Sequence, residues 1–301
     1  MKDQNTDLDP QNRGGMDRSR RDFVAFTAAA GLAAAAGPAS GADAKIVETD
    51  VVIKTPDGTT DAVFVHPSAG SHPGVLVWTD VFGLRPVFRE FGKRLAAEGY
   101  AVVVPNAFYR SAKPPVIENL ASFDFQDPAA RAKLRTLADP LNAPGAAERD
   151  AVAYIDFLDA QPQVNQHKKI GTQGYCIGGP LVLRTAAVRP DRIGAGGCFH
   201  GGVGLATDSP NSPHLLAPKI KAQLYIAIAG NDDMRQPEGK DKLKEAFAAA
   251  KVPAEVEVYT DAQHGWCVPD VPLQNGRSVY NKPDAERAWT KLLALYRATL
   301  T

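Results

Sequence analysis

The sequence is poor in cysteine, has no excess of either charge, and has no apolar run of membrane-spanning length. Its three cysteines, Cys176, Cys198 and Cys267, form no Cys-x-x-Cys pair, which excludes a disulfide framework, a zinc ribbon and a thioredoxin-like redox pair. Lys and Arg number 34, as do Asp and Glu, so no overall field attracts nucleic acid or an anionic membrane. We therefore expect a small-molecule partner, and no residues have the spacing of metal ligands.

Residues 1–44 carry three features in the order of an export signal. Ser19 to Val24 reads SRRDFV, an apolar run extends from Phe23 to Gly37, and a small-x-small site ends at Ala44. This order resembles a bacterial twin-arginine signal peptide. The run is too short and too rich in alanine for a stable membrane anchor. The resemblance implies export by the twin-arginine machinery to the periplasm and removal of residues 1–44. The alternative is a disordered tail with a chance arginine pair.

Residues 45–301 alternate short β-branched runs with longer amphipathic stretches, which predicts a single α/β domain with a mostly parallel sheet and helices on both faces. Residues 47–55 and 60–67 flank a Pro-Asp-Gly turn and predict an antiparallel pair. Residues 106–144 read as a surface excursion that covers a site. Further strands are predicted at 74–78, 100–105, 168–176, 192–200, 222–230 and 254–260. Helices are predicted at 86–99, 127–139, 145–161, 179–189, 238–251 and 283–300.

The stretch GYCIGG, residues 174–179, follows a predicted buried strand and opens a predicted helix. Gly174, Cys176 and Gly178 form the small-x-nucleophile-x-small pattern of a nucleophile elbow, where a sharp turn leaves no room for larger side chains. The helix N-terminus there favours a thiolate. The alternative is a buried structural cysteine among packing glycines.

Two further polar residues follow strands later in the chain. Asp233 stands in the pattern Gly230-x-x-Asp233-x-x-x-Pro237, and His264 stands in the loop DAQHGW. Cysteine, acid and histidine in this order match the chain order of α/β-hydrolase triads. Asp232 is the alternative acid, and the spacing to Pro237 favours Asp233.

The motifs GYCIGG, AGNDDMRQP and DAQHGWCVPD, with VWTDVFGL upstream, resemble those of the dienelactone hydrolase family of α/β-hydrolases. The resemblance implies an α/β-hydrolase fold and cofactor-independent cleavage of a small ester or lactone. It assigns Cys176 as nucleophile, His264 as base and later acid, and Asp233 as the orienting carboxylate. The backbone N–H groups of Val81 and Ile177 correspond to the family's oxyanion hole.

The sequence departs from the family at two positions. Asp80 stands where the family has a glutamate that contacts the resting thiol, and Val268 stands where the family has a substrate-binding arginine. Arg85 and Arg131, or Arg135, are the candidates for another carboxylate contact. These departures leave open a broader small-ester carboxylesterase, or a non-catalytic binding protein on the same fold.

Overall fold

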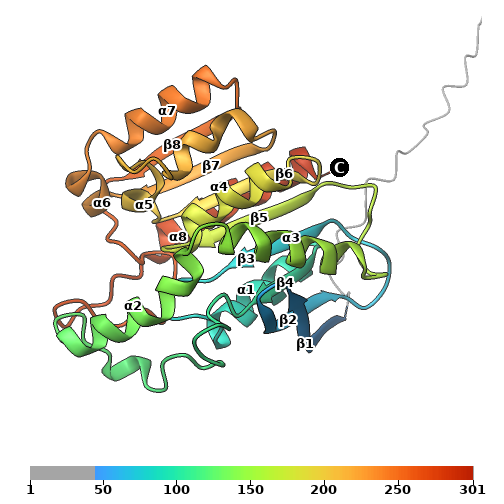
Figure 1. Ribbon diagram of the computed structural model, residues 1–301, viewed down its shortest axis with the longest axis horizontal. Helices are drawn as coiled ribbons and strands as arrows, with labels where there is room; N and C mark the ends of the chain where they lie inside the picture. Colours follow the sequence, from blue (N-terminus) through green and yellow to red (C-terminus); the bar gives the residue numbers. More distant parts are fainter. Residues whose placement is uncertain (1–44, 301) are drawn as a thin grey trace, which may run out of the picture. The chain divides into compact units, whose positions relative to one another are not determined.

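An eight-stranded sheet forms the centre of the computed structural model, which describes residues 45–300 (Figure 1). The strand order is β1-β2-β4-β3-β5-β6-β7-β8. The pairs β1–β2 and β2–β4 are antiparallel, and all the other pairs are parallel. The strands are β1 (Ile46–Thr55), β2 (Gly58–Pro67), β3 (Gly74–Trp78), β4 (Ala101–Pro105), β5 (Ile170–Tyr175), β6 (Ile193–Phe199), β7 (Gln223–Ala229) and β8 (Ala254–Tyr259).

Helices cover both faces of this sheet (Figure 1), which confirms the predicted α/β architecture. The helices are α1 (Pro86–Ala97), α2 (Pro128–Asn142), α3 (Ala146–Asp159), α4 (Gly178–Val188), α5 (Gly202–Leu205), α6 (Gly230–Arg235), α7 (Gly239–Ala249) and α8 (Lys282–Thr299), with 3-10 turns η1 (Leu120–Ser122) and η2 (Pro213–Lys219). The short elements α5, α6 and η2 carry no helical period, and the sequence did not predict them.

Two apolar cores form because successive residues of a strand point to opposite faces of the sheet. In β3, Leu76 and Trp78 join the core beneath α3, α4 and α7, whereas Val75 and Val77 join the core beneath α1 and α8. A strand that is covered on both faces has no solvent side for a polar residue. This explains why β3 reads GVLVW and why all five residues are buried.

The predicted excursion, residues 106–144, contains η1 and α2. Helix α2 begins where the Asp127 side chain accepts a hydrogen bond from the Ala129 amide and Pro128 occupies the first turn, a pairing typical of helix starts. Leu134, Leu137 and Leu141 are its buried leucines. The excursion is therefore anchored to the domain by one apolar helix face.

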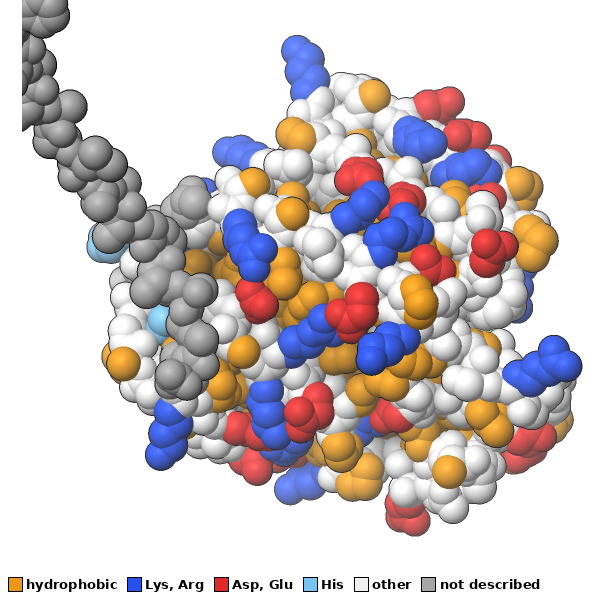
Figure 2. All heavy atoms as spheres, turned by 180° about the vertical axis from the view of Figure 1, so that it is seen from behind, with side chains coloured by type: hydrophobic (Ala, Val, Ile, Leu, Met, Phe, Trp, Pro, Cys, Tyr) orange, Lys and Arg blue, Asp and Glu red, His pale blue; other side chains and the backbone are white. Residues whose placement is uncertain are grey.

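Charged residues of both signs are mixed over the face shown in Figure 2, in keeping with the zero net charge. Within residues 45–300, no helix combines the length and apolar character that a bilayer crossing requires. The predicted export signal, residues 1–44, lies outside the described residues.

Candidate active site

Cys176 occupies a sharp turn between β5 and α4, as the elbow pattern predicts. Its φ is +53°, a left-handed conformation that is unusual for a residue with a side chain. A Cβ on Gly174 would lie 2.1 Å from the Gly178 carbonyl oxygen, and one on Gly178 would lie 2.7 Å from the Thr79 carbonyl oxygen. Both positions require glycine because backbone segments meet there. The partly exposed thiol is thus held above the end of the sheet.

The structure brings His264 to Cys176, as predicted. His264 lies in the loop after β8, and its Nε2 is 3.1 Å from Cys176 Sγ. Two side chains hold this loop: the His264 amide donates to Asn231 Oδ1 at 2.8 Å, and Gln274 Nε2 donates to the His264 carbonyl oxygen at 3.1 Å. Sequence reasoning missed Asn231, in α6, and Gln274, because a single amide side chain outside a recognised motif carries no pattern.

The predicted orienting carboxylate was off by one residue, because Asp232 and not Asp233 contacts His264. Asp232 Oδ2 lies 2.6 Å from His264 Nδ1, and the Asp232 side chain is fully buried. Asp233 instead pairs with Lys240 at 2.8 Å. The reason is local: β7 runs directly into α6, and consecutive residues of a helix point about 100° apart. Only one of the two carboxylates can face the histidine.

The charges around His264 raise its pKa to about 10. Burial by itself would lower the pKa, but the interactions of His264 with Cys176 and with the Asp232 carboxylate raise it and outweigh burial. Because the Asp232 carboxylate contacts His264 Nδ1, the other ring nitrogen, Nε2, faces the Cys176 sulfur. The three side chains therefore form the chain of hydrogen bonds, nucleophile to base to orienting acid, that activates a nucleophile.

The two backbone amides predicted for an oxyanion hole flank the elbow. Ile177 directly follows Cys176, and Val81 follows β3, whose end touches Gly178. Among the hydrogen bonds of the described residues, neither amide N–H acts as a donor. Both donors are therefore unengaged within the described residues, and of the two residues Ile177, but not Val81, lines the cavity that contains Cys176 and His264.

Asp80 and Arg85 face each other and not the thiol. The Arg85 guanidinium donates to both Asp80 carboxylate oxygens at 2.6 and 2.9 Å, and to Asp270 at 2.7 and 3.0 Å. The Phe82 amide adds a bond to Asp80 Oδ1 at 2.9 Å. Burial would lower the pKa of Arg85, but the two carboxylates raise it. In the described residues the Cys176 thiol has His264 as its hydrogen-bond partner, so the expected contact with Asp80 is not formed.

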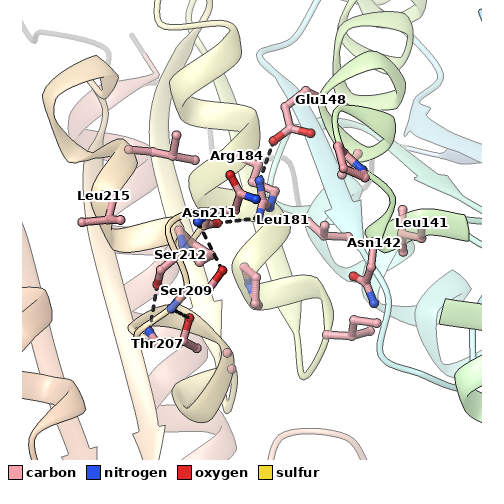
Figure 3. Close-up of a pocket in the computed structure, with 18 of the residues that line it drawn as sticks. Leu141, Asn142, Glu148, Leu181, Arg184, Thr207, Ser209, Asn211, Ser212 and Leu215 are labelled. Atoms are coloured by element: carbon pink, nitrogen blue, oxygen red, sulfur yellow. Dashed lines mark hydrogen bonds and ion pairs between the residues drawn. The ribbon is translucent and has the colours of Figure 1, made fainter. Parts of the chain in front are cut away.

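A cavity of about 810 Å³ opens over Cys176 and His264. Figure 3 shows Leu141, Leu181 and Leu215 on its wall, and the pair Glu148–Arg184. Arg184 donates to Glu148 at 2.6 Å and to the Asn211 carbonyl oxygen at 3.0 Å, so its charge is already engaged. The cavity is mainly apolar, and its wall includes the end of α2, as expected for the excursion.

The other predicted contacts lie away from the cavity. Neither Arg85 nor Arg131 is part of its wall, and Arg131 is exposed and donates to the Phe125 carbonyl oxygen at 3.4 Å. Val268 is fully buried in the core beneath α1 and α8. The structure therefore does not place any of these residues where it would hold a substrate carboxylate.

The remaining cysteines are buried and free. Cys198 is fully buried and its thiol donates to the Gly179 carbonyl oxygen at 3.3 Å, while Cys267 packs in the opposite core. Burial raises the pKa of both thiols, which disfavours the reactive thiolate form. In residues 45–300 no three His, Cys, Asp or Glu side chains gather as metal ligands would.

Comparison with known proteins places the chain in a family. Residues 60–300 match the model of the dienelactone hydrolase family. A carboxymethylenebutenolidase of Rhodococcus opacus is 27% identical over 253 residues, which cover 82% of this chain and 90% of that protein.

Two crystal structures show the same fold. A dienelactone hydrolase from Anabaena variabilis has a TM-score of 0.58 at 18% identity, and a dienelactone hydrolase-like promiscuous phosphotriesterase from metagenomic libraries has a TM-score of 0.68 at 22% identity. Each comparison covers 85% of this chain and 99% of the other chain.

Proposed function

We propose that this chain, which belongs to the dienelactone hydrolase family, hydrolyses a small ester or lactone through a thioester on Cys176. One observation carries the proposal: Cys176, His264 and Asp232 are joined by contacts of 3.1 and 2.6 Å, and Cys176 and His264 line a mainly apolar cavity. A nucleophile, a base and an orienting acid in hydrogen-bond contact are the parts that acyl transfer requires.

The geometry supports the following sequence of steps. The Cys176 thiolate attacks the carbonyl carbon, and the amides of Val81 and Ile177 stabilise the oxygen that becomes negative. The carbon–oxygen bond to the alcohol then breaks, and His264 Nε2 gives the leaving oxygen its proton. Water attacks the thioester while His264 takes a proton from it. The carbon–sulfur bond breaks, the acid leaves and the thiolate returns.

The cavity wall favours an uncharged ester over an anionic lactone. Its cations are Arg184, which Glu148 and Asn211 already engage, and the exposed Lys219. Because Arg184 is engaged and Lys219 is exposed to solvent, a substrate carboxylate that enters the cavity would lose its hydration and gain no buried, unengaged lysine or arginine as its partner. The cavity therefore favours a broader small-ester carboxylesterase over a hydrolase specific for dienelactone.

The test is hydrolysis of a dienelactone and a panel of short aryl esters by the purified chain and by its Cys176→Ala variant. We expect turnover that disappears in the variant, with uncharged aryl esters cleaved faster than the dienelactone. Equal rates in both proteins would refute the thiol mechanism. Binding of these compounds without turnover in either protein would identify a non-catalytic binding protein.

We further propose that the chain is exported by the twin-arginine machinery. The motif SRRDFV, the apolar run and the small-x-small site before Lys45 support this proposal. Replacing Arg20 and Arg21 with lysine should retain the protein in the cytoplasm of a bacterial host. Equal periplasmic recovery of both forms in cell fractionation would contradict the proposal.

A further inference from the structure

His200 stands beside Cys176 at the carboxyl end of the neighbouring strand. Tyr175 of β5 pairs with Phe199 of β6, so the residues that follow them occupy equivalent places, and the Cys176 amide donates to the Phe199 carbonyl oxygen at 3.0 Å. His200, like Cys176, has a left-handed backbone, with φ of +41°. Such a conformation in a residue other than glycine costs on the order of 1–3 kcal/mol and concentrates at functional sites.

The His200 side chain is buried without a hydrogen-bond partner in the described chain. Its exposed fraction is 1%, and neither Nδ1 nor Nε2 bonds to another described residue. His200 is nevertheless one of the residues that line the cavity, together with Cys176 and His264, and the centroid of its ring is 4.9 Å from that of His264. Buried polar groups are almost always satisfied, so a molecule in the cavity is the natural partner of this ring.

The ring is uncharged at neutral pH. Burial, and then the neighbouring His264, lower the pKa of His200 well below its usual value. A neutral imidazole has one N–H donor and one nitrogen acceptor. It can therefore bind a hydroxyl group or water without placing a second positive charge beside protonated His264.

The place of His200 in the sheet indicates which reacting group it meets. Strand β5 lies between β3 and β6, so Val81, after β3, and His200, after β6, stand on opposite sides of Cys176. The carbonyl oxygen turns toward the Val81 and Ile177 amides. The leaving oxygen, and later the attacking water, must stand at His264 Nε2, because that atom exchanges a proton with each of them.

We propose that His200 is a catalytic residue that hydrogen-bonds the water that hydrolyses the Cys176 thioester. The water gives one hydrogen to His264 Nε2, its second O–H donates to the unprotonated nitrogen of His200, and its oxygen forms the new bond to the acyl carbon as the carbon–sulfur bond breaks. The alcohol oxygen leaves through the same position in the first half-reaction. This inference rests on the proposed function.

The test separates the two half-reactions with p-nitrophenyl acetate, whose leaving group needs little help to depart. The full chain is compared with its His200→Phe variant, which keeps a ring and removes both nitrogens. We expect acylation to be nearly unchanged and steady-state turnover to fall roughly tenfold to a hundredfold, as for the loss of one well-placed hydrogen bond. A burst of p-nitrophenol, a lower KM and an acetylated Cys176 in intact-protein mass spectrometry should accompany the fall.

The Thr172→Val variant is the matched control. The Thr172 hydroxyl is also buried and unpartnered, but it lies within β5 and is not part of the cavity wall. Its removal should leave both half-reactions unchanged. Alkylation of Cys176 by iodoacetamide reports in every variant whether the nucleophile is intact.

A second variant, His200→Gly, suits the left-handed backbone and covers the case in which His200→Phe does not fold. It should also accumulate the acetyl-enzyme, and added imidazole should restore its deacylation more than it accelerates that of the wild type. Variants with wild-type turnover and no accumulated acyl-enzyme would overturn the role of His200. A wild-type protein that releases p-nitrophenol no faster than its Cys176→Ala variant would instead overturn the proposed function.

Discussion

Replacement of Asp232 by asparagine removes the negative charge from the hydrogen-bond chain while keeping the shape of the side chain. The contact with His264 Nδ1 is 2.6 Å long and the carboxylate is fully buried, so water cannot replace it. Loss of a charge-assisted hydrogen bond costs about 1.5–3 kcal/mol, which corresponds to a factor of about 10 to 150 in rate. An asparagine that favours the wrong histidine tautomer raises the loss toward about 10⁴-fold.

We therefore expect kcat to fall by about 10²- to 10⁴-fold in Asp232→Asn, measured as aryl ester hydrolysis by a protein with an unchanged circular dichroism spectrum. Asp233→Asn is the matched control. It breaks a partly exposed pair with Lys240, worth about 1 kcal/mol of stability at most, and should change kcat by about twofold or less. A larger loss of kcat in Asp233→Asn than in Asp232→Asn would refute the assignment of the carboxylate.

Two further predictions concern charges that the structure pairs. Because His264 must carry a proton to give to the leaving oxygen and its pKa is raised to about 10, kcat/KM should fall as pH rises through about 10. Since Asp232 contributes to that rise, the alkaline limb should move to lower pH in Asp232→Asn, and a limb at the same pH in both proteins would contradict this. Arg85→Met should lower the free energy of unfolding by about 3–5 kcal/mol in urea titrations, because it strips the buried Asp80 of its counter-charge. The double variant that also carries Asp80→Asn should recover much of the lost free energy of unfolding. An Arg85→Met variant that unfolds at the same urea concentration as the wild type would refute the reasoning.

The sharp turn that carries Cys176 and the strands of the sheet could be predicted from the sequence because short-range patterns specify them. Gly174 and Gly178 are dictated by a turn only a few residues long, where a Cβ would meet backbone atoms. The all-apolar run of β3 follows from burial on both faces. Both features can be predicted without information about which distant segments of the chain pack against them.

The rest of the site depended on how distant segments meet. Asp232 and Asp233 are adjacent and alike, and only the orientation of α6 against the His264 loop decides between them. His200 ends an apolar strand in the sequence, and its place beside Cys176 comes from the register of β5 and β6.

Arg85 likewise looked available to a substrate, but its partner Asp270 lies 185 residues further along the chain. The sequence alone determined the elbow, the strand and helix alternation and the histidine loop, because local sterics and apolar periodicity encode them. Tertiary packing alone decided which acid contacts His264, which carboxylates hold Arg85 and which second histidine stands beside Cys176, because those contacts join residues that no local pattern relates.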